Sequence, residues 1–518
     1  MRTKNSMVNV VAGLVGQGVA LIISYIARRA FIDVLSEDYL GINGLFTNIL
    51  TMLSLVEIGI GPAIVYSLYK PLAEKNVEKV KVLMRLFQRA YILIGILVLI
   101  LGLVMTPFIQ IFMESMPNVP YIRVIFLLFV ANTAISYFFS YRRSLIIADQ
   151  RRYVDTITHY GFYSLLNIAQ IIFLYLTRNY FVFLGLQIGF TLLENIVISY
   201  KAKKMYPFLK EKTSQKLDGE TRQQIIRNTS AMIFHKVGGI VVGSTDNLLI
   251  SAKVGVWAVG FYSNYQLVIN ALKSIITQVF QAMTASIGNL GATESKDKAL
   301  AVFKPVFLMN FWIYSFCSIC MFILFNPFIE LSFGKNLLFG QEVVFIMVLN
   351  FYLTGMRQAV LTFRDAFGIY WQDRFKPLFE AAINLVVSFS LANAFGVFGI
   401  FIGTAVSTLT TCFWIEPYIL YKYAFDQPVR GYFLRYGIYT LLTVAAGGLT
   451  LLACSVFETV TWFSLLGRAA FCLLIPNGLY FLIFHRTEDF RYLMGTVLPV
   501  AKSFLSGLRG RLKGKKEQ

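Results

Sequence analysis

Long apolar segments recur from one end of the chain to the other, with short polar connections between them. Runs of about 20 residues are long enough to cross ~30 Å of hydrocarbon as a helix. They lack the alternation of apolar and polar positions that is typical of a membrane strand. Because lipid offers no partners for backbone polar groups, this pattern predicts an all-α polytopic membrane protein.

The apolar runs predict about 14 transmembrane helices. The expected spans are 7–30, 39–68, 86–112, 121–145, 157–177, 180–200, 228–251, 256–285, 303–328, 341–363, 378–396, 397–420, 431–456 and 463–484. The first run is long and rich in glycine, and no small-residue cleavage site follows it. We therefore interpret it as a permanent helix and not as a removed signal peptide.

Lysine and arginine are distributed unevenly between alternate connections. They are concentrated at 70–89, 142–152, 201–227 and 486–516, and they are sparse on the segments between. Cytoplasmic loops of membrane proteins carry such an excess, so both termini are expected to be cytoplasmic. The net charge of +20 is then explained by the anionic inner leaflet, and no nucleic-acid partner is expected.

The chain contains an internal repeat. Residues 9–69 align with 228–288 without a gap, and "FLGLQIG" at 183–189 aligns with "VFGIFIG" at 397–403. Each repeat holds six helices, so both begin on the cytoplasmic side and are related by a pseudo-twofold axis along the membrane normal. Parallel repeats of this kind are typical of transporters, with the substrate path between the two halves.

The repeat divides the chain into five parts. We expect an N-lobe at 1–200, a cytoplasmic basic linker at 201–227 and a C-lobe at 228–425. Two further helices follow at 426–485. The remaining segment, 486–518, has an apolar face and a basic end, which predicts an amphipathic cytoplasmic tail.

Two stretches of the sequence resemble a known family. They are "ARRAFIDVLSEDYLGINGLFTNILTMLSLVEIGIGPAIVYSLYKPLAEKN" and "GSTDNLLIS". Both are similar to the Wzx-type polysaccharide flippases, which share a superfamily, MOP, with MATE multidrug exporters and lipid II flippases. The resemblance implies two six-helix lobes around a central cavity that opens alternately to each side of the bacterial plasma (inner) membrane. It also implies export of undecaprenyl-pyrophosphate-linked oligosaccharides, usually driven by H⁺ or Na⁺, without a cofactor.

Cations inside the spans are candidates for binding the pyrophosphate of such a substrate. Arg28 and Arg29 end the first helix, and arginine suits forked contacts with phosphate, although both could instead reach the outer headgroups. Lys236, Lys273 and Arg357 lie deeper, where each either faces the cavity or pairs with a carboxylate on another helix. Adjacent helical positions point about 100° apart, so at most one of the first two should face the cavity.

Three further ionisable groups are candidates for ion coupling or for charge partners of these cations: Glu57, Asp246 and His235. For Glu57 the alternative is a structural hydrogen bond. A candidate hinge follows it at Gly59, Gly61 and Pro62, because proline removes a backbone donor and can kink the helix. Glu194 and Glu416, near cytoplasmic helix ends, are expected to pair with nearby lysines.

Other functions fit the sequence less well. A MATE-like multidrug antiporter would favour acidic cavity walls for cationic drugs, and a lipid II flippase would share the cationic path. The short outer loops leave no room for the external domain of a polysaccharide polymerase, and no catalytic or metal-binding motif is visible, so an enzyme is not expected. The expected partners are the lipid-linked glycan, membrane lipids and the polymerase and chain-length machinery, and the expected state is a monomer.

The cationic path generates a first prediction. Replacing Lys236 or Arg28 by alanine should abolish export, because each removes a positive charge from the path of the pyrophosphate. Export assays in cells should be accompanied by immunoblots that show unchanged abundance in the membrane. Full export by both variants would contradict the cationic cavity.

Overall fold

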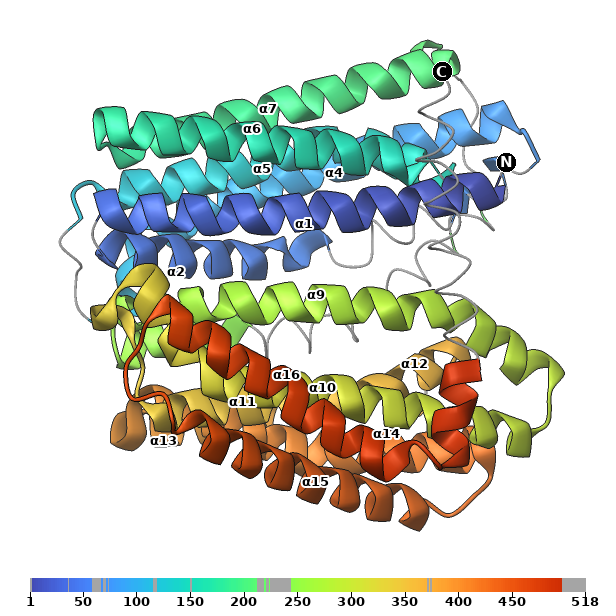
Figure 1. Cartoon of the computed structure of the whole chain (residues 1–518). Helices are drawn as coiled ribbons and strands as arrows, with labels where there is room; N and C mark the ends of the chain where they lie inside the picture. Colours follow the sequence, from blue (N-terminus) through green and yellow to red (C-terminus); the bar gives the residue numbers. More distant parts are fainter. Residues whose placement is uncertain are drawn as a thin grey trace, which may run out of the picture. The chain divides into compact units, whose positions relative to one another are not determined.

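The computed structural model describes residues 2–35, 37–57, 67–68, 71–72, 74–114, 119–149, 151–211, 219, 223, 244–369, 372 and 375–495. Within these ranges the secondary structure is helical and no strand occurs. Ten described helical segments are long and apolar enough to cross a membrane (Figure 1). The predicted fold class, an all-α polytopic membrane protein, is confirmed.

The first repeat forms long helices that pack side by side, with α6 lying between α1 and α7 (Figure 1). They are α1 (Arg2–Val34), α2 (Glu37–Leu53) with the 3₁₀ turn Ser54–Glu57, α4 (Val77–Met105) with the 3₁₀ turn Thr106–Phe112, α5 (Ile122–Ala148), α6 (Arg152–Thr177) and α7 (Tyr180–Met205). A short 3₁₀ turn, Pro207–Lys210, follows α7.

The second repeat and the two additional helices also consist mainly of long helices. After a helical segment at 244–253 come α9 (Val256–Thr293), α10 (Lys296–Phe333), the 3₁₀ turn Lys335–Leu337, α11 (Gln341–Met356), α12 (Gln358–Ala366), α13 (Lys376–Ser407), the π-helical segment Thr408–Cys412, α14 (Phe413–Leu420), the π-helical segment Tyr421–Phe425, α15 (Arg430–Cys454) and α16 (Trp462–Phe484). Each predicted span overlaps described helix.

Several helices extend beyond the apolar run that predicts them. α10 begins at Lys296, before the predicted span at 303–328, and the Ser295 hydroxyl caps it by accepting a hydrogen bond from the Lys298 amide at 3.3 Å. The helix begins where its free amides find a cap, whereas the apolar run marks only the part that suits lipid.

Packing divides the chain into two compact units. Unit 1 comprises 1–267 and 377–403, and unit 2 comprises 268–376 and 404–518. The start of α9 and most of α13 therefore belong to unit 1, while the rest of α9 belongs to unit 2. This division describes packing, and the sequence-based lobes at 1–200 and 228–425 stay a prediction.

Aromatic stacking attaches the last two helices to unit 2. Phe307 and Phe311 of α10 stack on Tyr432 and Tyr439 of α15, with ring centroids 4.8 and 4.3 Å apart. A hydrogen bond attaches α16 to α10, since the hydroxyls of Ser315 and Tyr480 are 2.5 Å apart. α15 and α16 are therefore integral parts of unit 2.

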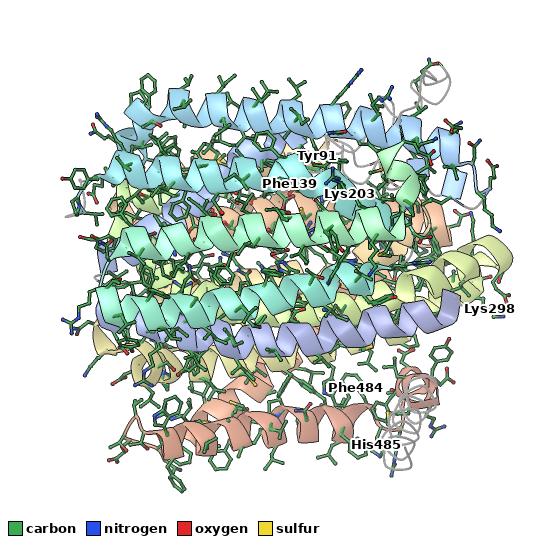
Figure 2. The ribbon with its side chains drawn as sticks, turned by 90° about the horizontal axis from the view of Figure 1, so that it is seen from above. Tyr91, Phe139, Lys203, Lys298, Phe484 and His485 are labelled. Carbon is green, nitrogen blue, oxygen red and sulfur yellow. The ribbon has the colours of Figure 1, made fainter. Side chains whose placement is uncertain are left out.

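The chain after α16 turns back along unit 2. Residues 488–495 are helical, and Arg435 of α15 donates a hydrogen bond to Asp489 at 2.6 Å. Lys298 at the start of α10 and His485 after α16 lie toward the same end of this unit (Figure 2). The charge pattern predicts that this end is cytoplasmic. The remainder of the expected tail, 496–518, lies outside the described residues.

A hairpin inside α13 separates two of the predicted spans. Gly396 has φ 56° and ψ −135°, which reverses the chain at the predicted boundary between 378–396 and 397–420. The two arms pack tightly: Ser388 donates a hydrogen bond to the Ile400 carbonyl at 2.9 Å, and a Cβ at Gly403 would lie 2.6 Å from the Ser388 nitrogen. The arms can approach this closely only because Gly399 and Gly403 lack side chains.

The hairpin generates a prediction with a control in the other repeat. Gly403→Ala should lower the free energy of unfolding by about 1–3 kcal/mol, because the added methyl group displaces the backbone of the other arm. Gly189, its repeat-equivalent, has no atom within 4 Å of such a methyl group, so Gly189→Ala should change stability little. Thermal unfolding of the purified variants in detergent compares them. Equal midpoints would show that the hairpin is not packed this tightly.

Candidate functional site

Arg28 and Arg29, at the end of α1, have different surroundings. Arg28 is partly buried and its guanidinium donates a hydrogen bond to the Ser263 hydroxyl of α9 at 2.9 Å, whereas Arg29 is exposed. Ser263 in turn donates to the Gly260 carbonyl at 2.7 Å. Because Arg28 has only a neutral partner among the described residues, its charge is not compensated by a carboxylate there.

Two glycines of α2 bring α9 into position beside α1. A Cβ at Gly41 would overlap the Val256 carbonyl oxygen and lie 2.6 Å from that residue's Cγ1, and a Cβ at Gly44 would lie 3.1 Å from Val259. α9 therefore packs directly on the backbone of α2 within unit 1. This close approach places Ser263, one turn after Val259, within reach of Arg28.

Glu57 lies at the end of the 3₁₀ turn that follows α2. Its Oε1 accepts a hydrogen bond from the Tyr91 hydroxyl of α4 at 3.0 Å, and Tyr137 of α5 stacks on Tyr91 with centroids 6.4 Å apart. The described partner of Glu57 is thus a phenol and not a cation. This contact corresponds to the alternative for Glu57 given above, a structural hydrogen bond. The change from α-helix to 3₁₀-helix directly precedes the predicted hinge.

Asp246 lies in a buried polar segment. Ser244, Thr245, Asp246 and Asn247 are each at most 9% exposed, although they occupy an apolar protein interior. Asn264 of α9 is fully buried, and neither end of its amide has a hydrogen-bond partner in the described part of the chain. Buried polar groups are costly unless they have hydrogen-bond partners, which the Asn264 amide lacks among the described residues.

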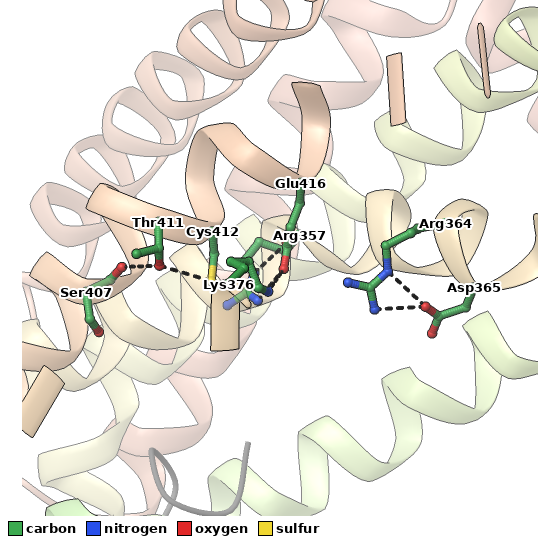
Figure 3. Close-up of polar contacts among 8 residues, drawn as sticks. All are labelled: Arg357, Arg364, Asp365, Lys376, Ser407, Thr411, Cys412 and Glu416. Atoms are coloured by element: carbon green, nitrogen blue, oxygen red, sulfur yellow. Dashed lines mark hydrogen bonds and ion pairs between the residues drawn. The ribbon is translucent and has the colours of Figure 1, made fainter. Parts of the chain in front are cut away.

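Arg357 belongs to an ion cluster in unit 2 (Figure 3). It donates two hydrogen bonds to the Glu416 carboxylate, from Nε at 2.9 Å and from Nη2 at 2.7 Å. Lys376 contacts the same carboxylate. The side chains of Glu416, Lys376 and Arg357 are 0%, 6% and 14% exposed. Arg357 is therefore engaged in the interhelical ion pair that the sequence left as an alternative, and Glu416 has the expected lysine partner.

The position of Arg357 follows from a break between two helices. α11 ends at Met356 and α12 begins at Gln358. The Asn310 amide of α10 donates hydrogen bonds to the Gly355 and Met356 carbonyls, both at 3.2 Å, so the carbonyls at the break have a partner. Glu416 lies on α14, between two π-helical segments that rotate its helix locally.

Sequence reasoning missed a second ion cluster, in unit 1. Arg143 of α5 contacts Glu194 of α7 at 2.5 Å and Asp155 of α6 at 2.9 Å, and His159 of α6 lies 3.1 Å from Glu194. From the sequence, Arg143 counts only among the Lys and Arg residues concentrated at 142–152, and Glu194 is expected to pair with a lysine. A histidine and a glutamate within apolar runs were the available signal, but their proximity depends on helix packing.

The remaining candidates divide into two groups. Lys273 is an exposed residue of α9 in unit 2. The structure does not describe His235 and Lys236 or the predicted hinge, Gly59, Gly61 and Pro62, so these residues lie outside the described ranges. Their roles stay predictions.

Solved structures of transporters share this fold. The lipid II flippase MurJ, in an inward closed conformation, has a TM-score of 0.64 and 12% identity, over 93% of this chain and 99% of that chain. An inward-facing multidrug resistance MATE-family transporter of the MOP superfamily has a TM-score of 0.61 and 15% identity, over 77% and 94%. For a Vibrio cholerae MATE transporter, VcmN in the bent form, the values are 0.51, 13%, 82% and 98%.

No family model and no curated protein matches the sequence. The chain therefore has the fold of MATE transporters and of a lipid II flippase, and it is a multi-pass membrane protein. At these identities the likeness shows the fold alone, and the Wzx-type resemblance stays a prediction.

The buried cluster of unit 2 generates a prediction about stability. Glu416→Gln removes the charge of the carboxylate that Arg357 and Lys376 both contact, and should destabilise the protein by about 3–5 kcal/mol. Lys376→Met leaves the neutral pair of Arg357 and Glu416 and should cost less. Thermal unfolding in detergent ranks the two variants, with the exposed Glu458→Gln as a control. A greater loss in Lys376→Met would contradict the charge argument.

Proposed function

We propose that the protein is a flippase that moves undecaprenyl-pyrophosphate-linked oligosaccharide repeat units from the inner to the outer leaflet of the bacterial plasma membrane. It would work by alternating access and supply capsule, exopolysaccharide or O-antigen-type polymers. The observation that carries the proposal is the fold likeness to a lipid II flippase over 93% of this chain and 99% of that one. The match with the lipid II flippase spans more of this chain than the match with the inward-facing MATE transporter, which spans 77%.

The charge balance inside the protein supports an anionic substrate. Arg357 and Arg143 are already paired with carboxylates, whereas Arg28 has only the Ser263 hydroxyl as a partner in the described part of the chain. An arginine of this kind can give its forked donors to a pyrophosphate without first breaking an ion pair. We assign Arg28 the main phosphate contact, and Arg29, Lys236 and Lys273 remain candidates for further cationic contacts.

An ion gradient would drive transport. Asp246 is a buried carboxylate among buried hydroxyl and amide groups, which suits binding of H⁺ or Na⁺. Glu57 and His235 remain candidates for the same role. The 3₁₀ turn at Ser54–Glu57 supports a hinge at the following residues, Gly59, Gly61 and Pro62.

Two alternatives share the fold. A lipid II flippase would carry the same pyrophosphate and lipid tail with a different glycan. A MATE-like multidrug antiporter would carry cationic compounds, for which an uncompensated arginine is unfavourable. We propose that the protein acts as a monomer and delivers its substrate to polymerase and chain-length machinery.

The proposal predicts a specific defect on depletion of the protein. Undecaprenyl-linked repeat units should accumulate on the inner leaflet at least about tenfold, as measured by mass spectrometry of extracted lipids and by their protection from an external glycosidase. Drug susceptibility should stay unchanged. Accumulation of lipid II instead would favour the first alternative, and altered drug resistance without any lipid accumulation would favour the second.

A further inference from the structure

The connection between α14 and α15 forms an open hollow in unit 2, which we call the α14–α15 pocket. It has a volume of about 410 Å³, and ligand pockets usually measure about 300–1,000 Å³. Its walls include Tyr418, Lys422, Asp426 and Arg430. Asp426 pairs at 3.5 Å with Lys296, which begins α10. The pocket therefore lies at the end of unit 2 that the charge pattern predicts to be cytoplasmic.

The backbone of this connection is held in a defined turn. Asp426 has φ 57° and ψ 42°, a left-handed conformation that aspartate adopts more readily than most residues. Its amide and the Gln427 amide both donate to the Tyr421 carbonyl, the second at 3.2 Å, so the π-helical segment ends at a fixed point. Pro428 has a restricted φ and precedes the first turn of α15. The pocket is therefore preformed.

The side chains of the pocket carry an excess of positive charge. Lys422 and Arg430 contribute two positive charges and Asp426 one negative charge. Asp426 already has Lys296 as its counter-ion. The four side chains together have three positive charges and one negative charge, so the net charge at the pocket is positive and favours an anionic ligand.

Neither cation of the pocket is paired with a carboxylate among the described residues. The Lys422 amine donates a hydrogen bond to the Tyr418 hydroxyl at 3.3 Å and lies 5.6 Å from the centroid of the Tyr423 ring. Arg430 is exposed and forms no ion pair in the described part of the chain. An anion can therefore bind both side chains without first breaking an ion pair.

Other cations at this end of unit 2 are already paired. Arg435 of α15 donates a hydrogen bond to Asp489 at 2.6 Å. Lys298 of α10 lies 2.7 Å from Glu294. The contrast shows that the cations of the α14–α15 pocket differ from their neighbours in having no acidic partner among the described residues.

The helices beside the pocket have exposed aromatic and apolar side chains. On α14, Trp414 and Tyr418 lie one turn apart and are 50% and 46% exposed, and on α15 Leu434 and Ile438 are 68% and 46% exposed. Tryptophan and tyrosine are enriched where lipid headgroups meet hydrocarbon. Because Tyr418 also belongs to the pocket wall, the pocket adjoins a surface that suits acyl chains.

We propose that the α14–α15 pocket binds the phosphate of an anionic glycerophospholipid, with Lys422 and Arg430 as the phosphate ligands. The acyl chains lie along the exposed side chains of α14 and α15. The positive charge of the pocket selects an anionic headgroup, because it repels the ammonium group of a zwitterionic one. The adjoining apolar surface selects a lipid over a soluble phosphate. This site does not depend on the proposed function.

The first test measures headgroup selectivity by native mass spectrometry of the full-length protein in detergent. Wild type should bind phosphatidylglycerol about tenfold more tightly than phosphatidylcholine with the same acyl chains, because two basic side chains contact the phosphate. The pocket variant, Lys422→Gln with Arg430→Gln, should lose this preference. Equal binding of the two lipids by wild type, or a preference that survives in the pocket variant, would overturn the site.

A matched control separates the pocket from the general charge of this end. Lys298→Gln with Arg491→Gln removes the same charge from two exposed residues outside the pocket. This control variant should keep the preference for phosphatidylglycerol. An equal loss of preference in the pocket variant and the control variant would show that only the overall charge attracts the lipid, which would overturn the site.

The second test locates the acyl chains. Trp414 precedes Lys422 by about two helical turns, and it is one of five tryptophans. In nanodiscs, phosphatidylglycerol with brominated chains, added as a minor fraction of the lipid, should quench tryptophan fluorescence more than brominated phosphatidylcholine. The excess should disappear in Trp414→Phe and in the pocket variant. No excess in wild type, or an excess that persists in Trp414→Phe, would overturn the placement of the chains.

Inorganic phosphate distinguishes a lipid site from a site for a soluble anion. Phosphatidylglycerol should raise the thermal unfolding midpoint of the wild type more than that of the pocket variant, because a ligand stabilises the state that binds it. Inorganic phosphate at the same concentration should leave both midpoints unchanged. If it stabilises the wild type as much as the lipid does, and not the pocket variant, the ligand is a soluble anion and the lipid site is wrong.

Discussion

The Glu416 carboxylate is fully buried, and it pairs with two cations, Arg357 and Lys376. This interaction illustrates the constraint on which the whole structure depends, because lipid and a low-dielectric interior leave every charge to be compensated within the protein. The ion pairs consequently join helices that the sequence keeps 40 to 59 residues apart. They hold the break between α11 and α12 in a defined position next to α14.

Against this background the exceptions are the informative residues. Among the described residues, Arg28 is a cation with a neutral hydrogen-bond partner, and Asn264 is a buried amide without one. Each costs free energy in the resting protein, and a bound phosphate, ion or proton would offset that cost. The proposed flippase therefore follows from where compensation is incomplete, and the fold supplies the frame that holds these groups.

The two repeats use one architecture for different local purposes. The pair of glycines at 185 and 189 contacts nothing that a methyl group would disturb, while the equivalent pair at 399 and 403 allows the α13 hairpin to close. The ion clusters differ in the same way, since one contains a histidine and the other a lysine. The two halves therefore share the order of their helices and differ in the residues that make the local contacts.

The sequence by itself determined the helical membrane fold, the order of the spans and the boundary at Gly396, because hydropathy and glycine act over a few neighbouring residues. It also predicted which charges lie within the spans. It did not determine their partners: Glu57 faces Tyr91, Arg357 faces Glu416, and Arg143 meets His159 through Glu194. Only the tertiary structure decided these pairs, since they depend on the rotation and depth of helices that are distant in sequence, and a local pattern contains no information about either.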